Sequence, residues 1–179
     1  MTPGELRRRI AYVLDEFHQP ALVEDFIDGR EFHVSLWGNG AIQMLPPAEM
    51  DFAAFADVHE RLCTYAAKFD AGSRHYTEIQ TRLPAPLKET EYQQLKETAI
   101  ATYRATGCRD YARLDIRLRD GCFYVLDVNP NADLSSEASL ALAAEAAGYS
   151  FGALGSRLVN LAAARHPVFG AERKSALTE

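Results

Sequence analysis

The chain has 179 residues, 47% of them hydrophobic and 25% charged, and its formal net charge at pH 7 is −6. This acidic balance argues against a general nucleic-acid binder, which needs a basic face, but allows a locally basic pocket for one nucleotide. We find neither a secretion signal in the first residues nor a run of about 18 apolar residues that would span a membrane. We therefore expect a cytoplasmic protein with no membrane and no nucleic-acid partner.

The first half of the chain predicts a helix followed by an antiparallel meander. Apolar residues at helical spacing predict a helix over 4–17 with an arginine-rich outer face. Residues 21–27, 31–37 and 41–45 have the pattern of strands, with turns at Asp28-Gly29 and Gly38-Asn39-Gly40. Pro46-Pro47 is expected to end the third strand. Residues 52–76 stay ambiguous: a helix fits as far as Leu62, and a loop fits from Tyr65 onward.

The second half predicts a long helix, a hairpin and two more helices. The helix covers about 88–106 and ends at Gly107. Strands over 111–118 and 122–128 are joined by an Asp120-Gly121 turn, and a polar loop over 130–137 leads to helices ending near 148 and 165. We expect one domain over 1–166 and a frayed, disordered tail over 167–179. This order predicts an α+β fold with a largely antiparallel sheet covered by helices.

The hairpin carries a cluster of oxygen-bearing side chains. Alternation places Arg113 and Asp115 on one face of its first strand, and Asp127 and Asn129 on one face of its second. Carboxylates held close together repel unless a cation or proton intervenes. Oxygen ligands without a nearby His or Cys favour Mg²⁺ over Zn²⁺. An alternating pattern alone more often means solvent-facing residues than a metal site. The neighbouring motifs therefore decide between these two interpretations.

The histidines and cysteines carry no motif of their own. His33, His59 and His75 have no motif relation to a serine or cysteine, which argues against a hydrolase. The three cysteines lack the spacing of a zinc knuckle or a disulfide framework, and we interpret them as buried free thiols: Cys63, Cys108 and Cys122.

Four segments in a fixed order resemble the ATP-grasp ligases. They are Val-Glu-Asp-Phe-Ile-Asp-Gly-Arg-Glu-Phe-His-Val (23–34), Tyr-Ala-Ala-Lys-Phe (65–69), Tyr-Ala-Arg-Leu-Asp-Ile-Arg (111–117) and Tyr-Val-Leu-Asp-Val-Asn-Pro-Asn (124–131). Within that superfamily they resemble the carboxyl-terminal part of the ATP-grasp domain of D-alanine–D-alanine ligases, over about residues 5–165. A ligase of the glutathione-synthetase or lysine-biosynthesis kind is a second possibility, which the segment at 65–69 disfavours.

The resemblance implies a nucleotide site and a metal site. Residues expected to line the adenine pocket are Glu24, Asp25, Phe26 and Ile27, while Glu31 would hydrogen-bond the ribose and Lys68 would contact phosphate. Asp115, Asp127 and Asn129 would hold one or two Mg²⁺ ions, or Mn²⁺. Arg113 would be the catalytic residue, stabilising the transferring phosphoryl group or the tetrahedral intermediate.

The family reaction uses ATP to turn a carboxylate into an acyl phosphate, which an amine then attacks. The sequence departs from the family in the loop after Asn129, where Asp133 stands in place of a glycine. Ser135 and Ser136 are possible acceptor contacts; alternatively, one of them caps the next helix. The small-molecule carboxylate and amine therefore stay open, as D-alanine, another amino acid or a peptide.

The resemblance covers only the nucleotide- and magnesium-binding half of such a ligase. No glycine-rich loop precedes Glu24. We expect an enzyme fragment that is inactive alone; the alternative is a non-catalytic, degenerate ATP-grasp binding module or a subunit that needs a partner. In either case an apolar face is expected to support a homodimer or another association.

Overall fold

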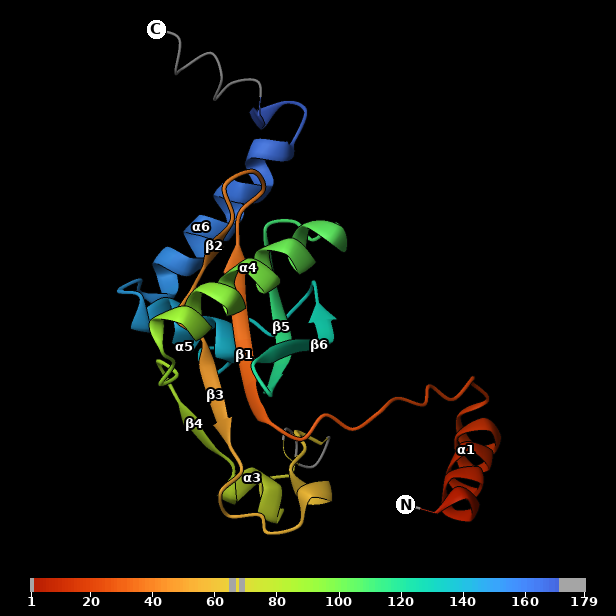
Figure 1. Cartoon of the computed structure of the whole chain (residues 1–179). Helices are drawn as coiled ribbons and strands as arrows, with labels where there is room; N and C mark the ends of the chain where they lie inside the picture. Colours follow the sequence, from red (N-terminus) through yellow and green to blue (C-terminus); the bar gives the residue numbers. More distant parts are fainter. Residues whose placement is uncertain (1, 65–66, 68–69, 171–179) are drawn as a thin grey trace, which may run out of the picture.

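A computed structural model describes residues 2–64, 67 and 70–170 (Figure 1). Lys68 and residues 171–179 of the expected tail lie outside the described residues. The helices are α1 (Pro3–Phe17), the 3-10 turn η1 (Val58–Glu60), α3 (Arg74–Glu78), α4 (Glu89–Ala105), α5 (Ser139–Ala146) and α6 (Phe151–Arg165). The strands are β1 (Arg30–Trp37), β2 (Gln43–Met44), β3 (Ala48–Asp51), β4 (Gln80–Arg82), β5 (Tyr111–Arg119) and β6 (Cys122–Asn129).

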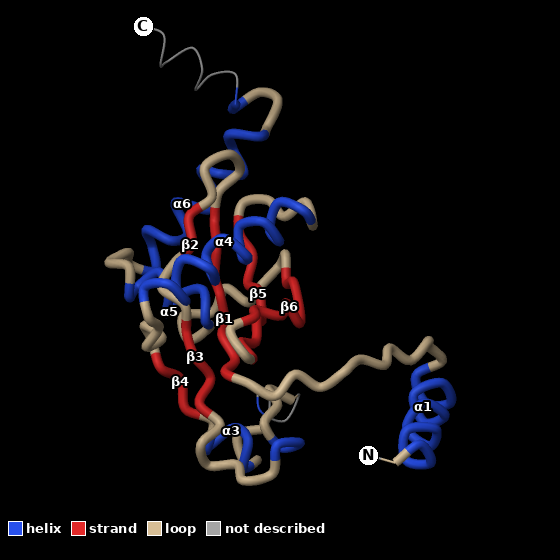
Figure 2. The backbone as a smooth tube through the Cα atoms, viewed as in Figure 1, coloured by secondary structure: helices blue, strands red, loops and turns tan. Residues whose placement is uncertain are grey.

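The strands form one sheet in the order β4-β3-β1-β5-β6, and β2 also pairs with β1 (Figure 2). Every pair is antiparallel. β1 lies at the centre and pairs with β5 along its whole length, from Arg30 opposite Leu118 to Trp37 opposite Tyr111. The expected α+β fold, with an antiparallel sheet and covering helices, is confirmed.

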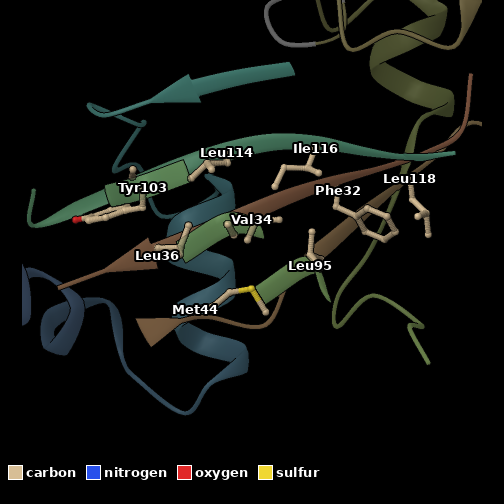
Figure 3. Packing of buried hydrophobic residues seen from close by; sticks show 11 residues of the cluster. Phe32, Val34, Leu36, Met44, Leu95, Tyr103, Leu114, Ile116 and Leu118 are labelled. Atoms are coloured by element: carbon tan, nitrogen blue, oxygen red, sulfur yellow. The ribbon is translucent and has the colours of Figure 1, made fainter. Parts of the chain in front are cut away.

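One face of the sheet is apolar and is covered by α4. Strand alternation turns Phe32, Val34 and Leu36 of β1 to this face. They form a buried cluster with the residues labelled in Figure 3, among them Leu114, Ile116 and Leu118 of β5, and Leu95 and Tyr103 of α4. Burial of each large side chain contributes roughly 1.5–3 kcal/mol, so this layer fixes the sheet's orientation.

The opposite face is apolar only at one end. There Trp37 packs under α5 and α6 in a second buried cluster that includes Leu45, Leu140 and Leu154. The indole Nε1 donates a hydrogen bond to Gln43 Oε1 at 2.8 Å. Beyond this cluster the face is polar, so the helices cover only part of it.

Two of the three predicted turns are confirmed as hairpin turns, while Asp28-Gly29 joins no pair of strands, because residues 21–27 form no strand. β1 leads into β2 through Gly38, whose φ of 123° is disfavoured for other residues, and a Cβ there would lie 2.2 Å from Ala41 O. Asp120 and Gly121 join β5 to β6 with φ values of 52° and 77°. Two positive φ angles are the signature of a two-residue hairpin turn.

The predicted strand over 21–27 is wrong. This segment pairs with no strand in the part of the chain that the structure describes, and Leu22 is 82% exposed. Its composition favours a strand, but it has no neighbouring sheet edge to pair with, and propensity alone does not form a strand. The third predicted strand, over 41–45, is shorter than expected and covers only β2, and the expected stop at Pro46-Pro47 separates β2 from β3. The short strands β3 and β4 were not predicted.

The predicted amino-terminal helix is confirmed as α1, which lies apart from the sheet at the end of the 18–29 segment (Figure 2). Thr2 caps it, and Glu5 completes the capping box. No residue of α1 is buried, so the arginine-rich face is exposed along with Tyr12, Leu14 and Phe17. Among the described residues, no helix is long and apolar enough to cross a membrane.

A Tyr103→Phe substitution is expected to lower the free energy of unfolding by about 1–2 kcal/mol at neutral pH. The buried phenol donates a hydrogen bond to Gly38 O at 2.9 Å, which the variant loses. Burial also raises the pKa of Tyr103, so the unfolded chain ionises first in alkali and the wild-type chain loses stability there. Denaturant titrations on both sides of the phenol's ordinary pKa measure the two effects. Tyr12→Phe is the exposed control, and equal alkaline losses in all three proteins would contradict the assignment.

Candidate functional site

The polar face of the sheet carries most of the residues singled out in the sequence. Three rows of opposed residues cross β1, β5 and β6. The rows are Ser35, Arg113 and Asn129; His33, Asp115 and Asp127; and Glu31, Arg117 and Tyr124. The structure therefore brings together the four hairpin residues expected to act on phosphate and metal.

An irregularity in β6 creates this alignment. Pairing runs from Arg119 opposite Cys122 to Ile116 opposite Val125, skips Leu126, and resumes with Asp115 opposite Asp127. In uninterrupted pairing Asp127 would lie opposite Leu114, whose side chain belongs to the apolar face. The bulge at Leu126 therefore places Asp127 and Asn129 on the same face as Asp115.

Asp115 and Arg113 form a tight pair on this face. Arg113 Nε donates to Asp115 Oδ1 at 2.8 Å, and Nη2 donates to Oδ2 at 3.0 Å. Both side chains are largely buried. Two donors occupy only part of the acceptor capacity of a carboxylate, so Asp115 can still serve a cation.

Asp115, Asp127 and Asn129, together called the hairpin site, have the composition of a magnesium site. Asp127 is exposed, while Asn129 Oδ1 accepts a hydrogen bond from Asn131 N at 3.2 Å, which holds the amide at the strand end. Two carboxylates on neighbouring strands and an amide oxygen are the hard ligands that Mg²⁺ uses, with open positions for water or phosphate. The donor set therefore fits the ion expected from the sequence.

Glu31 lies deeper in the face and is fixed by Arg117. Arg117 Nε and Nη2 both donate to Glu31 Oε2, at 2.8 and 2.7 Å. Arg117 also donates to Ile27 O at 2.6 Å and to Arg61 O, and its guanidinium lies 4.9 Å from the Phe26 ring centroid. A single buried arginine thus ties β1 and β5 to the 24–27 segment and to the loop after η1.

The 24–27 segment borders a cavity of about 620 Å³. Its lining includes Glu24, Asp25 and Phe26, with His59 and Leu62 from the loop around η1, and Glu5 of α1. Ile27 does not line this cavity; its carbonyl oxygen is the acceptor for Arg117. Three of the four expected adenine contacts therefore lie around one partly apolar space.

The loop before α5 is held by its own side chains. Asp133 Oδ1 accepts from Ser135 N at 2.8 Å, and Oδ2 accepts from Ser135 Oγ at 3.1 Å. Asp133, Ser135 and Ser136 are all exposed. The cap of α5 is Ala138, which has no side-chain cap bond, so the alternative that Ser135 or Ser136 caps the helix is wrong.

A histidine and a cysteine lie beside the expected site, which the sequence did not predict. His33 lies on the polar face, with Nε2 3.8 Å from Asp115 Oδ1. Cys63 lies close to His33, and both belong to the lining of another cavity. The interpretation of all three cysteines as buried is wrong, because Cys63 and Cys108 are half-buried and Cys122 is exposed. The alternation of Glu31 and His33 along β1 was the one signal that placed His33 beside the site.

A family profile described as "D-ala D-ala ligase C-terminus" matches residues 3–160. An uncharacterised protein, y4sG of Sinorhizobium fredii, is 36% identical over 166 residues, 92% of this chain and 47% of that protein. The D-alanine–D-alanine ligase of Pseudothermotoga lettingae is 33% identical over 130 residues, 73% of this chain and 40% of that protein. The chain thus spans less than half the length of these relatives.

Solved structures share the fold. The D-alanine–D-alanine ligase from Bacillus anthracis, complexed with ATP, superposes with a TM-score of 0.71 over 90% of this chain and 47% of its own, at 20% identity. The ligase of Coxiella burnetii gives 0.73 over 99% and 43%, also at 20% identity. The profile match, the sequence relatives and the common fold agree, and the chain belongs to the family of the carboxyl-terminal, ATP-grasp domain of D-alanine–D-alanine ligases.

Proposed function

We propose that the chain is the nucleotide- and magnesium-binding half of an ATP-dependent carboxylate–amine ligase. The observation that supports this most directly is the hairpin site, which the bulge at Leu126 aligns with Arg113 on the polar face. Bound Mg²⁺ would supply positive charge against the phosphate oxygens of ATP. Arg113 would add a charge-assisted donor at the same place, directed at the transferring phosphoryl group or an oxyanion.

The nucleotide is proposed to lie between the hairpin site and the cavity beside the 24–27 segment. Phe26 and Leu62 offer apolar surface for a base, while Glu24 and Asp25 offer polar groups. Glu31 would accept a ribose hydroxyl through Oε1, because Oε2 is bound by Arg117. Lys68 would contact phosphate. This arrangement separates base recognition from phosphate recognition.

The reaction is proposed to pass through an acyl phosphate that an amine attacks. Relatives named D-alanine–D-alanine ligase support an amino acid as the carboxylate and amine substrate. Asp133, Ser135 and Ser136 are exposed in the loop that follows β6, and we propose that they meet the acceptor, with Asp133 attracting its ammonium group. Because the chain spans less than half the length of its relatives, we propose that it binds nucleotide without completing ligation. The expected homodimer stays a prediction.

Calorimetric titration of Mg²⁺ and a non-hydrolysable ATP analogue into the chain tests this function. An Asp127→Ala, Asn129→Ala double variant removes two members of the hairpin site and is expected to weaken magnesium-dependent binding by about 100-fold. Asp120→Asn, in the turn of the same hairpin, is the matched control and should bind like the wild-type chain. Nucleotide binding that is equal in the double variant and the wild-type chain, or absent from both, would falsify the proposal.

A further inference from the structure

We propose that Glu31, His33 and Cys63 form a second cation site, selective for Zn²⁺ and similar transition metals. Three different donor atoms meet there: a carboxylate oxygen, an imidazole nitrogen and a thiol sulfur, all within 4.8 Å of one another. Glu31 and His33 are buried neighbours on the polar face of β1, and Cys63 comes from the loop after η1. None of the three belongs to the hairpin site.

The spacing of two of the three donors, from Glu31 and His33, is close to that of a tetrahedral site. Zn²⁺ binds nitrogen and oxygen at about 2.0–2.2 Å and sulfur at about 2.3 Å, so neighbouring ligand atoms lie roughly 3.3–3.8 Å apart. Glu31 Oε1 is 3.9 Å from His33 Nε2. Contraction by a few tenths of an ångström would bring these two atoms to bonding distance around one ion, a shift that side-chain rotation supplies.

The surrounding contacts orient the donors toward one another. Arg117 holds Glu31 through Oε2, which leaves Oε1 on the side of His33. The other ring nitrogen of His33, Nδ1, lies 3.2 Å from Ser139 Oγ at the start of α5. The serine hydroxyl can accept a hydrogen bond from Nδ1, and in that tautomer Nε2 is the metal-binding nitrogen, with Ser139 as its outer-shell partner.

The same arginine fixes the third ligand. Arg117 donates to the carbonyl oxygen of Arg61, two residues before Cys63, so the loop is tied to the guanidinium that holds Glu31. His33 and Cys63 both line a cavity of about 310 Å³, which gives an ion and its waters access. Three protein ligands and an open position are the composition of an exchangeable rather than a closed structural zinc site.

The donor chemistry separates this site from the hairpin site. Thiolate and imidazole are soft or borderline ligands that favour Zn²⁺, Co²⁺ and Cu²⁺ over Mg²⁺. The two sites are also close, because Asp115 Oδ1 lies 3.8 Å from the same Nε2 of His33. One consequence rests on the proposed function. If Glu31 contacts the ribose, Zn²⁺ would compete with the nucleotide for Glu31 Oε1.

Cobalt titration of the untagged chain tests the site without nucleotide. We expect one Co²⁺ per chain, with visible bands of tetrahedral cobalt and a thiolate-to-cobalt charge-transfer band that Zn²⁺ abolishes and excess Mg²⁺ does not. Cys63→Ser should lose the charge-transfer band, and His33→Gln should bind at least about tenfold more weakly. Cys122→Ser is the matched control and should keep both. A charge-transfer band that survives in Cys63→Ser, or no such band in the wild-type chain, overturns the proposal.

Alkylation of the wild-type chain gives a second readout that needs no variant. Zn²⁺ is expected to protect Cys63 from iodoacetamide by at least about tenfold, because the metal-bound thiolate is a poorer nucleophile and is less accessible. Cys108 and Cys122 are internal controls in the same peptide map. Equal reactivity of Cys63 with and without Zn²⁺ would overturn the site even if nucleotide binding is intact, and Zn²⁺ protection in a chain that binds no nucleotide would overturn only the proposed function.

Discussion

Replacing Arg117 with Met is expected to lower the free energy of unfolding by about 3–5 kcal/mol. Arg117 is 1% exposed, and its two donors to Glu31 are the carboxylate's main neutralising contacts. Met keeps much of the side-chain volume, so the cost comes from a buried carboxylate without its counter-charge and from the unmet carbonyl oxygens of Ile27 and Arg61. Urea denaturation followed by the fluorescence of Trp37, the only tryptophan, measures the change.

Two further variants separate charge from packing at this position. Adding Glu31→Leu to Arg117→Met removes the stranded charge, so the double variant is expected to be more stable than Arg117→Met alone. Arg104→Met, at an exposed position in α4, should change stability by less than about 0.5 kcal/mol. A single variant as stable as the Arg104→Met control would mean that the ion pair does not hold the polar face together.

Replacing Trp37 with Ala is expected to cost about 3–5 kcal/mol, because it removes the largest side chain of the cluster beneath α5 and α6. Trp37 is fully buried and meets the Tyr149 ring edge-on at a centroid distance of 5.0 Å. The loss falls on the contact between the helices and the sheet, while the cluster under α4 keeps its own residues. Thermal unfolding followed by circular dichroism measures the change, since the variant lacks its fluorophore.

The control for Trp37→Ala lies on α6, one of the two helices that pack against Trp37. Val159 on α6 is 68% exposed, and Val159→Ala should shift stability by no more than about 0.5 kcal/mol. Trp37→Phe should fall between the two, because Phe refills part of the space but cannot donate to Gln43. If all three proteins melt together, then α5 and α6 are held to the sheet by other contacts.

The central part of the fold was predictable because local and global preferences agree there. β1, β5 and β6 combine alternating side chains with tight glycine turns, and α4 combines a periodic apolar face with a glycine stop at Gly107. The 21–27 segment shows the limit of such patterns. Its residues favour extended backbone, but whether an extended segment becomes a strand depends on a neighbouring edge, which is information from elsewhere in the chain.

The site was predictable as a set of residues but not as a geometry. Alternation correctly grouped Asp127 with Asn129, yet it could not relate β6 to β5 across the irregularity at Leu126. The approach of Cys63 to His33 was also out of reach, because a loop joins it to the sheet and no periodicity governs a loop. The local sequence therefore predicts which functional side chains are present, and long-range strand pairing determines which of them lie close together.

The bulge at Leu126 determines which residues of β6 face each side of the sheet. Any deletion or insertion of a single residue between the Gly121 turn and Asp127 would exchange the two faces of β6 beyond that point, sending Asp127 and Asn129 toward α4 and Val128 toward the polar face. Deletions or insertions of two residues would keep each side chain on its present face. Homologous hairpins can therefore vary in length only in even steps if they are to keep the same residues on the polar face. An alignment that places a one-residue gap here pairs residues of opposite orientation.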